Sequence, residues 1–259
     1  MVREIVIKAE RQEQIRQLVE QRGAASVKEI AQTLGVSEMT VRRDLEEMAV
    51  AGDLVRVHGG ARRVSARKQS MLRGEYSHVE KRELNADAKR AIARRAVALI
   101  EPESTVFLGA GTTVEQMVPL LPEVHLRIVT NSLSVFNMIE HKASYELCLI
   151  GGTFRPRTAA FVGPLAEEAI AKLGLDIAFI GANGVYDGDV STSNAEEGRF
   201  QQLAFDKADA RYVVADASKL GRRDFFTFYH LVDLDGLICD ELISANERIA
   251  VEEFTNVLV

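Results

Sequence analysis

The sequence has little cysteine, which excludes a disulfide framework. Its two cysteines, Cys148 and Cys239, lie far apart inside apolar stretches (YELCLI and DGLICD), and we interpret both as buried small hydrophobic side chains. The five histidines are scattered without the spacing of metal ligands. We therefore expect no metal site and no cofactor.

Long hydrophobic runs are missing as well. The longest apolar runs are strand-sized, well below the roughly 18 residues that a membrane span needs. Met1 is followed by Arg3, Glu4 and Lys8, with no apolar segment and no cleavage site typical of a secretory signal. We therefore expect a cytoplasmic protein without a membrane partner.

An excess of positive charge, which is typical of nucleic-acid binders, is missing from the chain as a whole. The net charge is -6 over 259 residues, a length that suggests one large or two unequal domains. Residues 1–73 carry 14 Lys and Arg against 10 Asp and Glu, whereas residues 74–259 carry 18 against 28. Because a basic part precedes an acidic part, DNA binding stays open for the first part.

The basic part begins with the pattern of two short helices. Residues 10–22 carry an apolar stripe of helical spacing, made of Ile15, Leu18 and Val19. A capping box of Ser26 and Glu29 then predicts a second helix that ends at Gly35.

A third helix is predicted to begin at Ser37, after the tight turn LGVS. Its apolar residues Val41, Leu45 and Met48 must face the core, which leaves Arg42 and Arg43 to solvent or a partner. Two helices joined by such a turn predict a helix-turn-helix, whose second helix enters the DNA major groove. A small bundle of three helices with charged faces has the same periodicity and remains the alternative.

The segment GDLVRVHGGARR predicts a short basic hairpin, or wing, around Gly59 and Gly60. A capped second helix, paired arginines and a basic hairpin together favour a DNA reader over a plain bundle. Asp44 is interpreted as structural, pairing with a charge close to it in the sequence.

The strings VSEMTVRRDL and LVRVHGGA, with the residues around them, carry a resemblance over about fifty consecutive residues. They resemble the DNA-binding signature of the DeoR-type bacterial transcriptional repressors. Guanidinium groups suit guanine recognition or phosphate contact, and the residues leave both roles open for each arginine. The resemblance implies these DNA-binding residues: Ser37, Glu38, Thr40, Arg42, Arg43, Arg56 and His58.

Residues 62–82 are polar and poor in apolar periodicity, which is typical of a linker. Beyond them helical and strand-like patterns alternate, including a helical pattern over 111–121, and predict an α/β domain with a largely parallel sheet. We expect a winged helix-turn-helix over 1–61, a linker over 62–82 and the α/β domain over 83–259. The strand-like runs are TVFLG, RIVT, ELCLIGG, IAFIGA, RYVVAD and GLICD.

Small and polar residues follow these strand-like runs, where ligands of such sheets bind. The turn GAGTT opens a predicted helix and offers N–H groups and two hydroxyls to a phosphate. It lacks the GKS or GKT ending of a P-loop. Taken alone, such a turn is also an ordinary connection between a strand and a helix. Candidate cations for a phosphate are Lys89, Arg155 and Lys219.

The blocks LGAGTT, VTNS, IGGTFR, FIGANG, STSNAEEG and VVADASKLG resemble the DeoR-type sensor domain in order. The resemblance implies a fold like that of ribose-phosphate isomerases and CoA-transferases, and a phosphorylated sugar as effector. The implied effector residues are Lys89, Gly111, Thr112, Thr113, Asn131, Ser132, Gly152, Arg155, Asn183, Glu197 and Lys219.

Two positions depart from the family pattern. Asn183 stands where many members have an acidic residue, and Gln201 stands where many have a lysine. The missing lysine argues against an effector with a second phosphate or an extra carboxylate near Gln201.

Together these observations predict a repressor of a carbohydrate catabolic operon that a phosphorylated sugar releases from operator DNA. We expect a homo-oligomer, a dimer or tetramer, because one winged helix reads only a short half-site. Asn183 cannot act as a base, so we do not expect an enzyme. Four carboxylates, Asp187, Asp189, Glu196 and Glu197, keep open the alternative of an isomerase-like enzyme with an appended DNA-binding domain. A DNA binder without a ligand would leave the polar strand ends unexplained.

Overall fold

The structure is a computed structural model that describes residues 8–50, 54–57, 59–62 and 78–259. The chain forms two compact units, Met1–Gly74 and Glu75–Val259, each described by itself below. His58, expected at the wing, lies outside the described residues, as do residues 63–77 of the expected linker.

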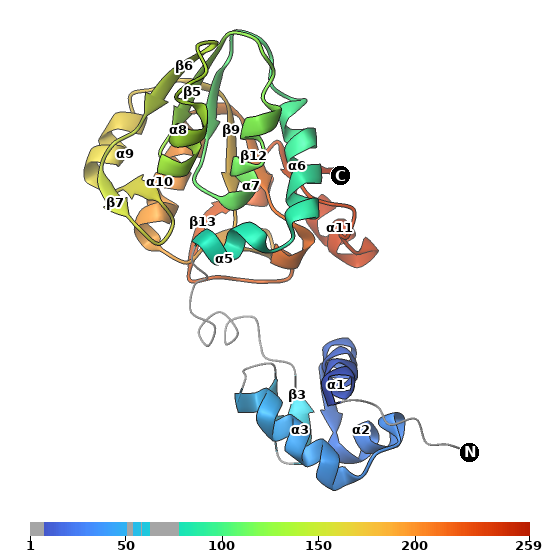
Figure 1. Ribbon diagram of the computed structural model, residues 1–259. Helices are drawn as coiled ribbons and strands as arrows, with labels where there is room; N and C mark the ends of the chain where they lie inside the picture. The colour runs from blue at the N-terminus through green and yellow to red at the C-terminus, as the bar shows by residue number, and fades with distance from the viewer. Residues whose placement is uncertain (1–7, 51–53, 58, 63–77) are drawn as a thin grey trace. The chain divides into compact units, whose positions relative to one another are not determined.

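The described residues of the first unit form three helices and a three-stranded antiparallel sheet in the order β1-β3-β2 (Figure 1). The predicted helix-turn-helix and hairpin are thereby confirmed. The helices are α1 (Lys8–Arg22), α2 (Val27–Leu34) and α3 (Glu38–Val50), and the strands are β1 (Ala24–Ser26), β2 (Val55–Val57) and β3 (Gly60–Arg62).

Side-chain caps set the ends of α2 and the start of α3. Ser26 Oγ accepts from the Glu29 amide at 3.2 Å while Glu29 Oε2 accepts from the Ser26 amide at 2.8 Å, so the capping box is confirmed. Gly35 closes α2 in the left-handed conformation, with φ 66°. Ser37 Oγ then accepts from the Thr40 amide at 3.2 Å and begins α3.

The sheet has one strand more than the sequence predicts, because β1 pairs with β3. Gly60 faces this strand so closely that a Cβ atom there would lie 2.4 Å from the Ala25 carbonyl oxygen. The Val27 amide also donates to the Gly59 carbonyl at 2.8 Å. A three-residue strand is too short to show alternation, which explains why the sequence pattern misses it. The hairpin is therefore attached to the start of α2.

The second unit is built on a seven-stranded sheet in the order β15-β14-β12-β9-β4-β5-β6, and every pairing in it is parallel. The predicted α/β architecture is confirmed, and each of the six strand-like runs contributes one strand. Only β15 lacks a counterpart in the prediction. The strands are β4 (Thr105–Leu108), β5 (Leu126–Thr130), β6 (Tyr145–Leu149), β9 (Leu175–Gly181), β12 (Ala208–Val214), β14 (Gly236–Ile238) and β15 (Val257–Leu258).

Helices cover both faces of this sheet (Figure 1). Alternate residues of β4 point to opposite faces, so Val106 and Leu108 pack in one core and Phe107 in the other. The first face carries α6 (Ala86–Val97), α7 (Thr112–Glu115), the 3-10 turn η1 (Val118–Leu120) and α8 (Leu133–Ile139); the second carries α9 (Pro164–Ile170), α10 (Ala195–Asp206) and α11 (Ala245–Glu252).

The predicted helix over 111–121 is wrong in extent, since α7 is a single turn and η1 follows separately. Pro119 lies in the first turn of η1 and has no N–H to continue the α-helical pattern.

Short strands add two smaller sheets that the sequence pattern does not reveal. The hairpin β7 (Thr153–Arg155) and β8 (Ala160–Val162) follows β6. An antiparallel sheet contains β10 (Gly184–Tyr186), β11 (Asp189–Thr192) and β13 (Phe226–His230).

Candidate functional site

The candidate DNA surface is the exposed face of α3 together with β2. A hollow of about 900 Å³ lies beside it, and five of the expected DNA-binding residues line it: Ser37, Thr40, Arg42, Arg43 and Arg56. Glu38, in the first turn of α3, lies 3.6 Å from Arg42 as an exposed ion pair. The structure thus brings six of the seven expected residues together, and the seventh is His58, outside the described residues.

Arg56 connects the wing to α3. Its Nη1 donates to the Arg42 carbonyl at 3.0 Å and lies 3.4 Å from Glu46 Oε2. Because these contacts are made by the guanidinium, Arg56 positions the wing beside the arginines of α3. The ion pair of Arg42 with Glu38 is exposed and therefore weak.

Asp44 is buried and structural, as expected, but its partner is not local. Arg11 of α1 donates to it twice, from Nε to Oδ2 at 2.5 Å and from Nη2 to Oδ1 at 3.1 Å. The hydrogen bond to Asp44 raises the pKa of Arg11. The expected local pairing is wrong because Asp44 shares the buried face of α3 with Val41 and Leu45, while Arg42 and Arg43 point outward. Arg11 also lines the hollow, and the sequence pattern gives no sign of it.

In the second unit, polar residues gather where the strands β12, β9, β4, β5 and β6 end. These five strands are neighbours in a parallel sheet, so the segments that follow them meet at one edge. Several polar side chains there are buried: Thr112, Thr113, Asn131, Ser132 and Asp216. Burial of this much polarity at one edge is typical of a ligand site.

Lys89, on α6, is a buried cation at this edge, with 4% of its surface exposed. Its Nζ donates to the Lys81 carbonyl, and Thr112 Oγ1 donates to the same oxygen at 3.5 Å. Burial lowers the pKa of Lys89; the negative charges of Asp216 and Glu115 oppose this, while the positive charges of Lys219 and Lys81 lower the pKa further. Among the described residues, no carboxylate lies within 4 Å of its ammonium group. A buried ammonium without a close counter-charge favours an anionic ligand.

Lys81 is a candidate that the sequence pattern misses, because it lies in the polar stretch interpreted as linker. The stretch ends in helix α5 (His78–Glu83), and Lys81 Nζ donates from this helix to Asn183 Oδ1 at 3.1 Å. Lys89, Thr112 and Asn183, expected as effector residues from three distant blocks, thus all contact Lys81.

Glu115, at the end of α7, is a second candidate that the sequence pattern misses. It is buried, and two side chains of α5 reach it: His78 Nε2 lies 2.5 Å from Oε1, and Arg82 Nη2 lies 3.3 Å from Oε2. The sequence gives no sign of the pair of His78 with Glu115, because 37 positions separate the two residues.

The hairpin β7–β8 gathers another group of expected residues. Arg155 Nε lies 3.4 Å from Glu197 Oε1 on α10, and Thr158 Oγ1 donates to that same oxygen. Gly152 precedes the hairpin in a position where a Cβ would lie 2.7 Å from the Val162 carbonyl oxygen. Only glycine allows this close approach of backbone.

Asn131 and Ser132 lie beside the hairpin, and their side chains also serve the fold. Asn131 Nδ2 donates to the Phe161 carbonyl at 3.0 Å, and Ser132 Oγ caps α8 by accepting from the Val135 amide at 3.2 Å. A ligand would therefore share these groups with the protein.

The remaining expected effector residues are Gly111, Thr113 and Lys219. Thr113 is buried in α7, while Gly111 precedes that helix with open space where a Cβ would be. Because α7 is one turn long, it offers N–H groups but little helix dipole. Lys219 ends the 3-10 turn η2 (Ala217–Lys219), near enough to Lys89 to affect its pKa. Gln201 Oε1, one turn beyond Glu197 on α10, is buried without a hydrogen-bond partner in the described part of the chain.

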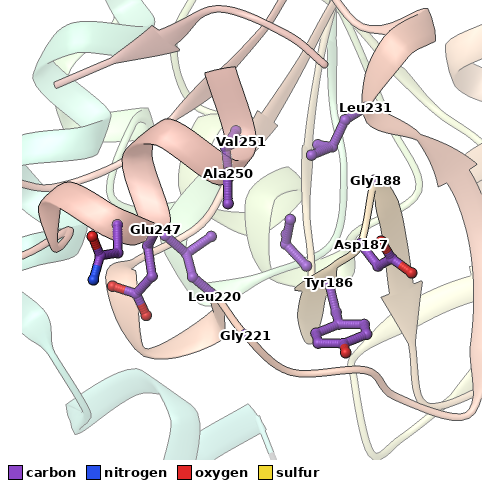
Figure 2. Close-up of a pocket in the computed structure, with 11 residues that line it drawn as sticks. Tyr186, Asp187, Gly188, Leu220, Gly221, Leu231, Glu247, Ala250 and Val251 are labelled. Atoms are coloured by element: carbon purple, nitrogen blue, oxygen red, sulfur yellow. The ribbon is translucent and has the colours of Figure 1, made fainter. Parts of the chain in front are cut away.

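A separate pocket of about 350 Å³ opens between β10, the residues that follow η2, and α11 (Figure 2). Its lining is mainly apolar, contains the carboxylates Asp187 and Glu247, and includes no lysine or arginine. None of the expected effector residues lines it, and the local charge disfavours a phosphate.

Comparison with known proteins decides the family. The DeoR-like helix-turn-helix domain matches residues 11–67, and the DeoR C terminal sensor domain matches residues 84–241. The chain belongs to the DeoR family. With a helix-turn-helix domain joined to a sensor domain, this DeoR-family protein is a DNA-binding transcriptional regulator.

Relatives of this DeoR-family chain match over nearly its whole length. The lactose phosphotransferase system repressor of Staphylococcus epidermidis is 40% identical over 235 residues, which cover 90% of this chain and 92% of that repressor. The repressor of the same name from Streptococcus mutans is 38% identical with the same coverage. A solved ribose 5-phosphate isomerase from Methanocaldococcus jannaschii shares 19% identity, with a TM-score of 0.40 over 52% of this chain and 55% of that one. A likeness this low indicates nothing about activity.

The described ranges of this DeoR-family protein also bear on a membrane span and on a metal site. None of the helices there has the length and hydrophobicity to cross a membrane. No cluster of three or more His, Cys, Asp or Glu in those ranges could hold a metal ion. Cys239 is buried as expected, and burial raises the pKa of its thiol to about 12, whereas Cys148 is only half-buried.

Proposed function

We propose that this protein represses a carbohydrate catabolic operon and leaves its operator when a phosphorylated sugar binds at the carboxyl edge of the parallel sheet. The carrying observation is the buried ammonium of Lys89, which has a neutral carbonyl as its partner and Thr112 beside it. A phosphate would supply the missing counter-charge and accept from both groups.

The proposed functions are assigned to the expected domains. Residues 1–61 read DNA, residues 83–259 together with the α5 residues before them bind the effector, and the rest of residues 62–82 joins the two parts in a cytoplasmic protein. The first turns of α3 would enter the major groove, with Ser37, Glu38 and Thr40 at the groove edge and Arg42 and Arg43 above bases or phosphates. Since one such unit covers a short half-site, the repressor acts as a dimer or tetramer.

The proposed effector carries a single phosphate. Lys89, Thr112 and Lys219 would hold that phosphate, while the group around Arg155, Glu197 and Asn131 would contact sugar hydroxyls. Gln201, a neutral residue, offers no charge for a second anionic group. The relatives' name favours a phosphorylated derivative of lactose or of one of its hexoses as the first compound to test.

A ligand panel tests the effector half of the proposal. The full chain is heated with inorganic phosphate, galactose 6-phosphate, glucose 6-phosphate, fructose 6-phosphate and ribose 5-phosphate, and the unfolding temperature is recorded. We expect one sugar phosphate to raise the unfolding temperature more than inorganic phosphate and to reduce operator binding. If no compound raises it, the sensor proposal fails. If the stabilising compound is converted to an isomer, the enzyme alternative replaces it.

A gel-shift titration tests the DNA half. Arg42→Ala combined with Arg43→Ala should abolish binding to DNA from upstream of the controlled genes, while the response of the unfolding temperature to the effector persists. Arg90→Ala, which removes an exposed arginine from α6, is the matched control. Unchanged operator binding by the double variant would overturn the assignment of α3.

A further inference from the structure

Helix α5 crosses the carboxyl edge of the sheet beside α7 (Figure 1). Both ends are anchored on Glu115, through His78 at 2.5 Å near the start of α5 and Arg82 at 3.3 Å near its end. The His78 amide also donates to the Arg157 carbonyl of the β7–β8 hairpin at 3.1 Å. These contacts place α5 directly over the turn that the proposed effector would occupy.

Lys81, in the middle of α5, already engages the groups that the phosphate would need. Its carbonyl accepts from Lys89 Nζ and from Thr112 Oγ1, and its own Nζ donates to Asn183 Oδ1 at 3.1 Å. Three expected effector residues are therefore in contact with one residue of α5.

A phosphate and the Lys81 carbonyl compete for the same donors. A charged phosphate oxygen is a stronger acceptor than a neutral carbonyl, so it would take the ammonium of Lys89 and the hydroxyl of Thr112. The carbonyl oxygen carries partial negative charge and would be repelled by the anion beside it. The Lys81 carbonyl therefore loses these partners when the site fills.

We propose that α5 is a strap held closed by its contacts with Glu115, Lys89 and Thr112, and that the effector displaces it. The proposal rests on the proposed function and adds how that site is regulated. In the sequence α5 is the first helix after the segment that joins the two units, so its displacement alters the point where the chain enters the sensor unit.

Removal of a residue that holds the strap closed and removal of a residue that binds the effector should have opposite effects on effector affinity. If effector binding must first open the strap, the apparent affinity is reduced by the fraction of molecules in which the strap is closed. Arg82 contacts Glu115, not the effector groups, and Arg82→Ala should weaken the strap without altering the site. Removal of a cation that touched the effector would instead reduce affinity.

The first experiment measures dissociation constants of inorganic phosphate and galactose 6-phosphate for the full chain by titration calorimetry. Arg82→Ala should bind both about two- to fivefold more tightly, as expected for loss of a partly exposed ion pair. His78→Gln, which weakens the other contact to Glu115, should act in the same direction. Arg90→Ala removes an equal charge from α6 and should leave both constants unchanged. Weaker or unchanged binding by both strap variants would overturn the proposal.

The second experiment follows amide hydrogen exchange of the full chain with and without the same two compounds. We expect slower exchange at residues 111–115 and faster exchange at residues 78–83. Protection at 111–115 with unchanged or slower exchange at 78–83 would refute the strap and leave the proposed function intact. No protection at 111–115 by either compound would refute both.

Discussion

The guanidinium of Arg11 in α1 donates two hydrogen bonds to the carboxylate of Asp44 in α3, although 33 positions separate the two residues in the sequence. Asp44 is 2% exposed and lies on the side of α3 opposite the arginines that face outward. The pair fixes α3 against α1, and so it sets the direction in which Arg42 and Arg43 are presented.

Asp44→Ala should therefore destabilise the first unit. It leaves the Arg11 guanidinium without its carboxylate, at a cost of about 1.5–3 kcal/mol for lost hydrogen bonds to a charged group. Faster amide exchange in α1 and α3 of the full chain measures the effect. Glu47→Gln, which removes an exposed partner of Lys8, is the control and should leave exchange unchanged. Equal exchange in both variants would contradict the structural role of Asp44.

Gly60→Ala should separate the wing from β1. The added Cβ would lie 2.4 Å from the Ala25 carbonyl oxygen and 2.9 Å from Ser26 Cα, both rigid backbone atoms. We expect a loss of about 1–3 kcal/mol in the stability of the unit, as for other overpacked sites, and weaker operator binding. Gly174→Ala, where no atom lies within 4 Å of the new Cβ, should change neither the thermal unfolding nor the gel-shift result.

Arg56→Ala should weaken operator binding. The slope of binding affinity against salt concentration should change by less than the loss of one phosphate contact would cause. The guanidinium of Arg56 is engaged with the Arg42 carbonyl and Glu46, so its main effect is to position the wing. Gel-shift titrations at several salt concentrations give the slope. A fall of about 0.9 in that slope would mean that Arg56 neutralises a phosphate directly.

Lys89→Met should raise the unfolding temperature of the ligand-free chain and abolish its response to phosphate. Burial lowers the pKa of Lys89 in the folded chain. Between that lowered value and the ordinary lysine value of about 10.4, the unfolded chain binds more protons, so stability rises with pH in this window. Below the window the buried charge disfavours folding throughout, and a neutral side chain of similar size removes that effect.

Thermal unfolding from pH 7 to 10, with and without an excess of inorganic phosphate, tests the role of Lys89. The native chain should gain stability with pH relative to Lys89→Met in the absence of phosphate. Lys219→Met, which removes a half-buried lysine from the same edge, is the comparison and should show a smaller difference. A Lys89→Met variant that still responds to phosphate would exclude Lys89 from the site.

Arg155→Met should reduce effector affinity about tenfold, equivalent to roughly 1.4 kcal/mol. Arg155 is paired with Glu197 at 3.4 Å, and its loss removes a cation while it leaves the buried carboxylate of Glu197 near the sugar. Arg157→Met, on the same hairpin but exposed, keeps the backbone carbonyl that His78 contacts and serves as control. Equal affinities of the two variants would remove Arg155 from the effector site.

The sequence predicts those parts of the fold that are set by local chemistry. The apolar spacing of Ile15 and Val41 and the caps at Ser26 and Ser37 depend on neighbours within a few residues, and the structure confirms them. The alternation of helices with strand-like runs likewise indicates the parallel sheet. Each of these signals lies within one element.

Features that depend on distant partners leave no such signal. Helix α5 is polar, and Glu115 and Asn183, far along the chain, contact its side chains, so its sequence is typical of a linker. Asp44 finds its partner in another helix for the same reason. Strands such as β1 and β15 are too short for alternation and form only because a neighbouring strand is already present.

The position of β9 in the middle of the parallel sheet has a consequence for biosynthesis. β9 pairs with β4 through Phe107 and Ala178, and with β12, which follows it in the chain. The sheet can therefore form only after most of the sensor has left the ribosome, whereas the described helices and strands of the first unit end at Arg62. During translation a DNA reader is thus complete well before the unit that regulates it.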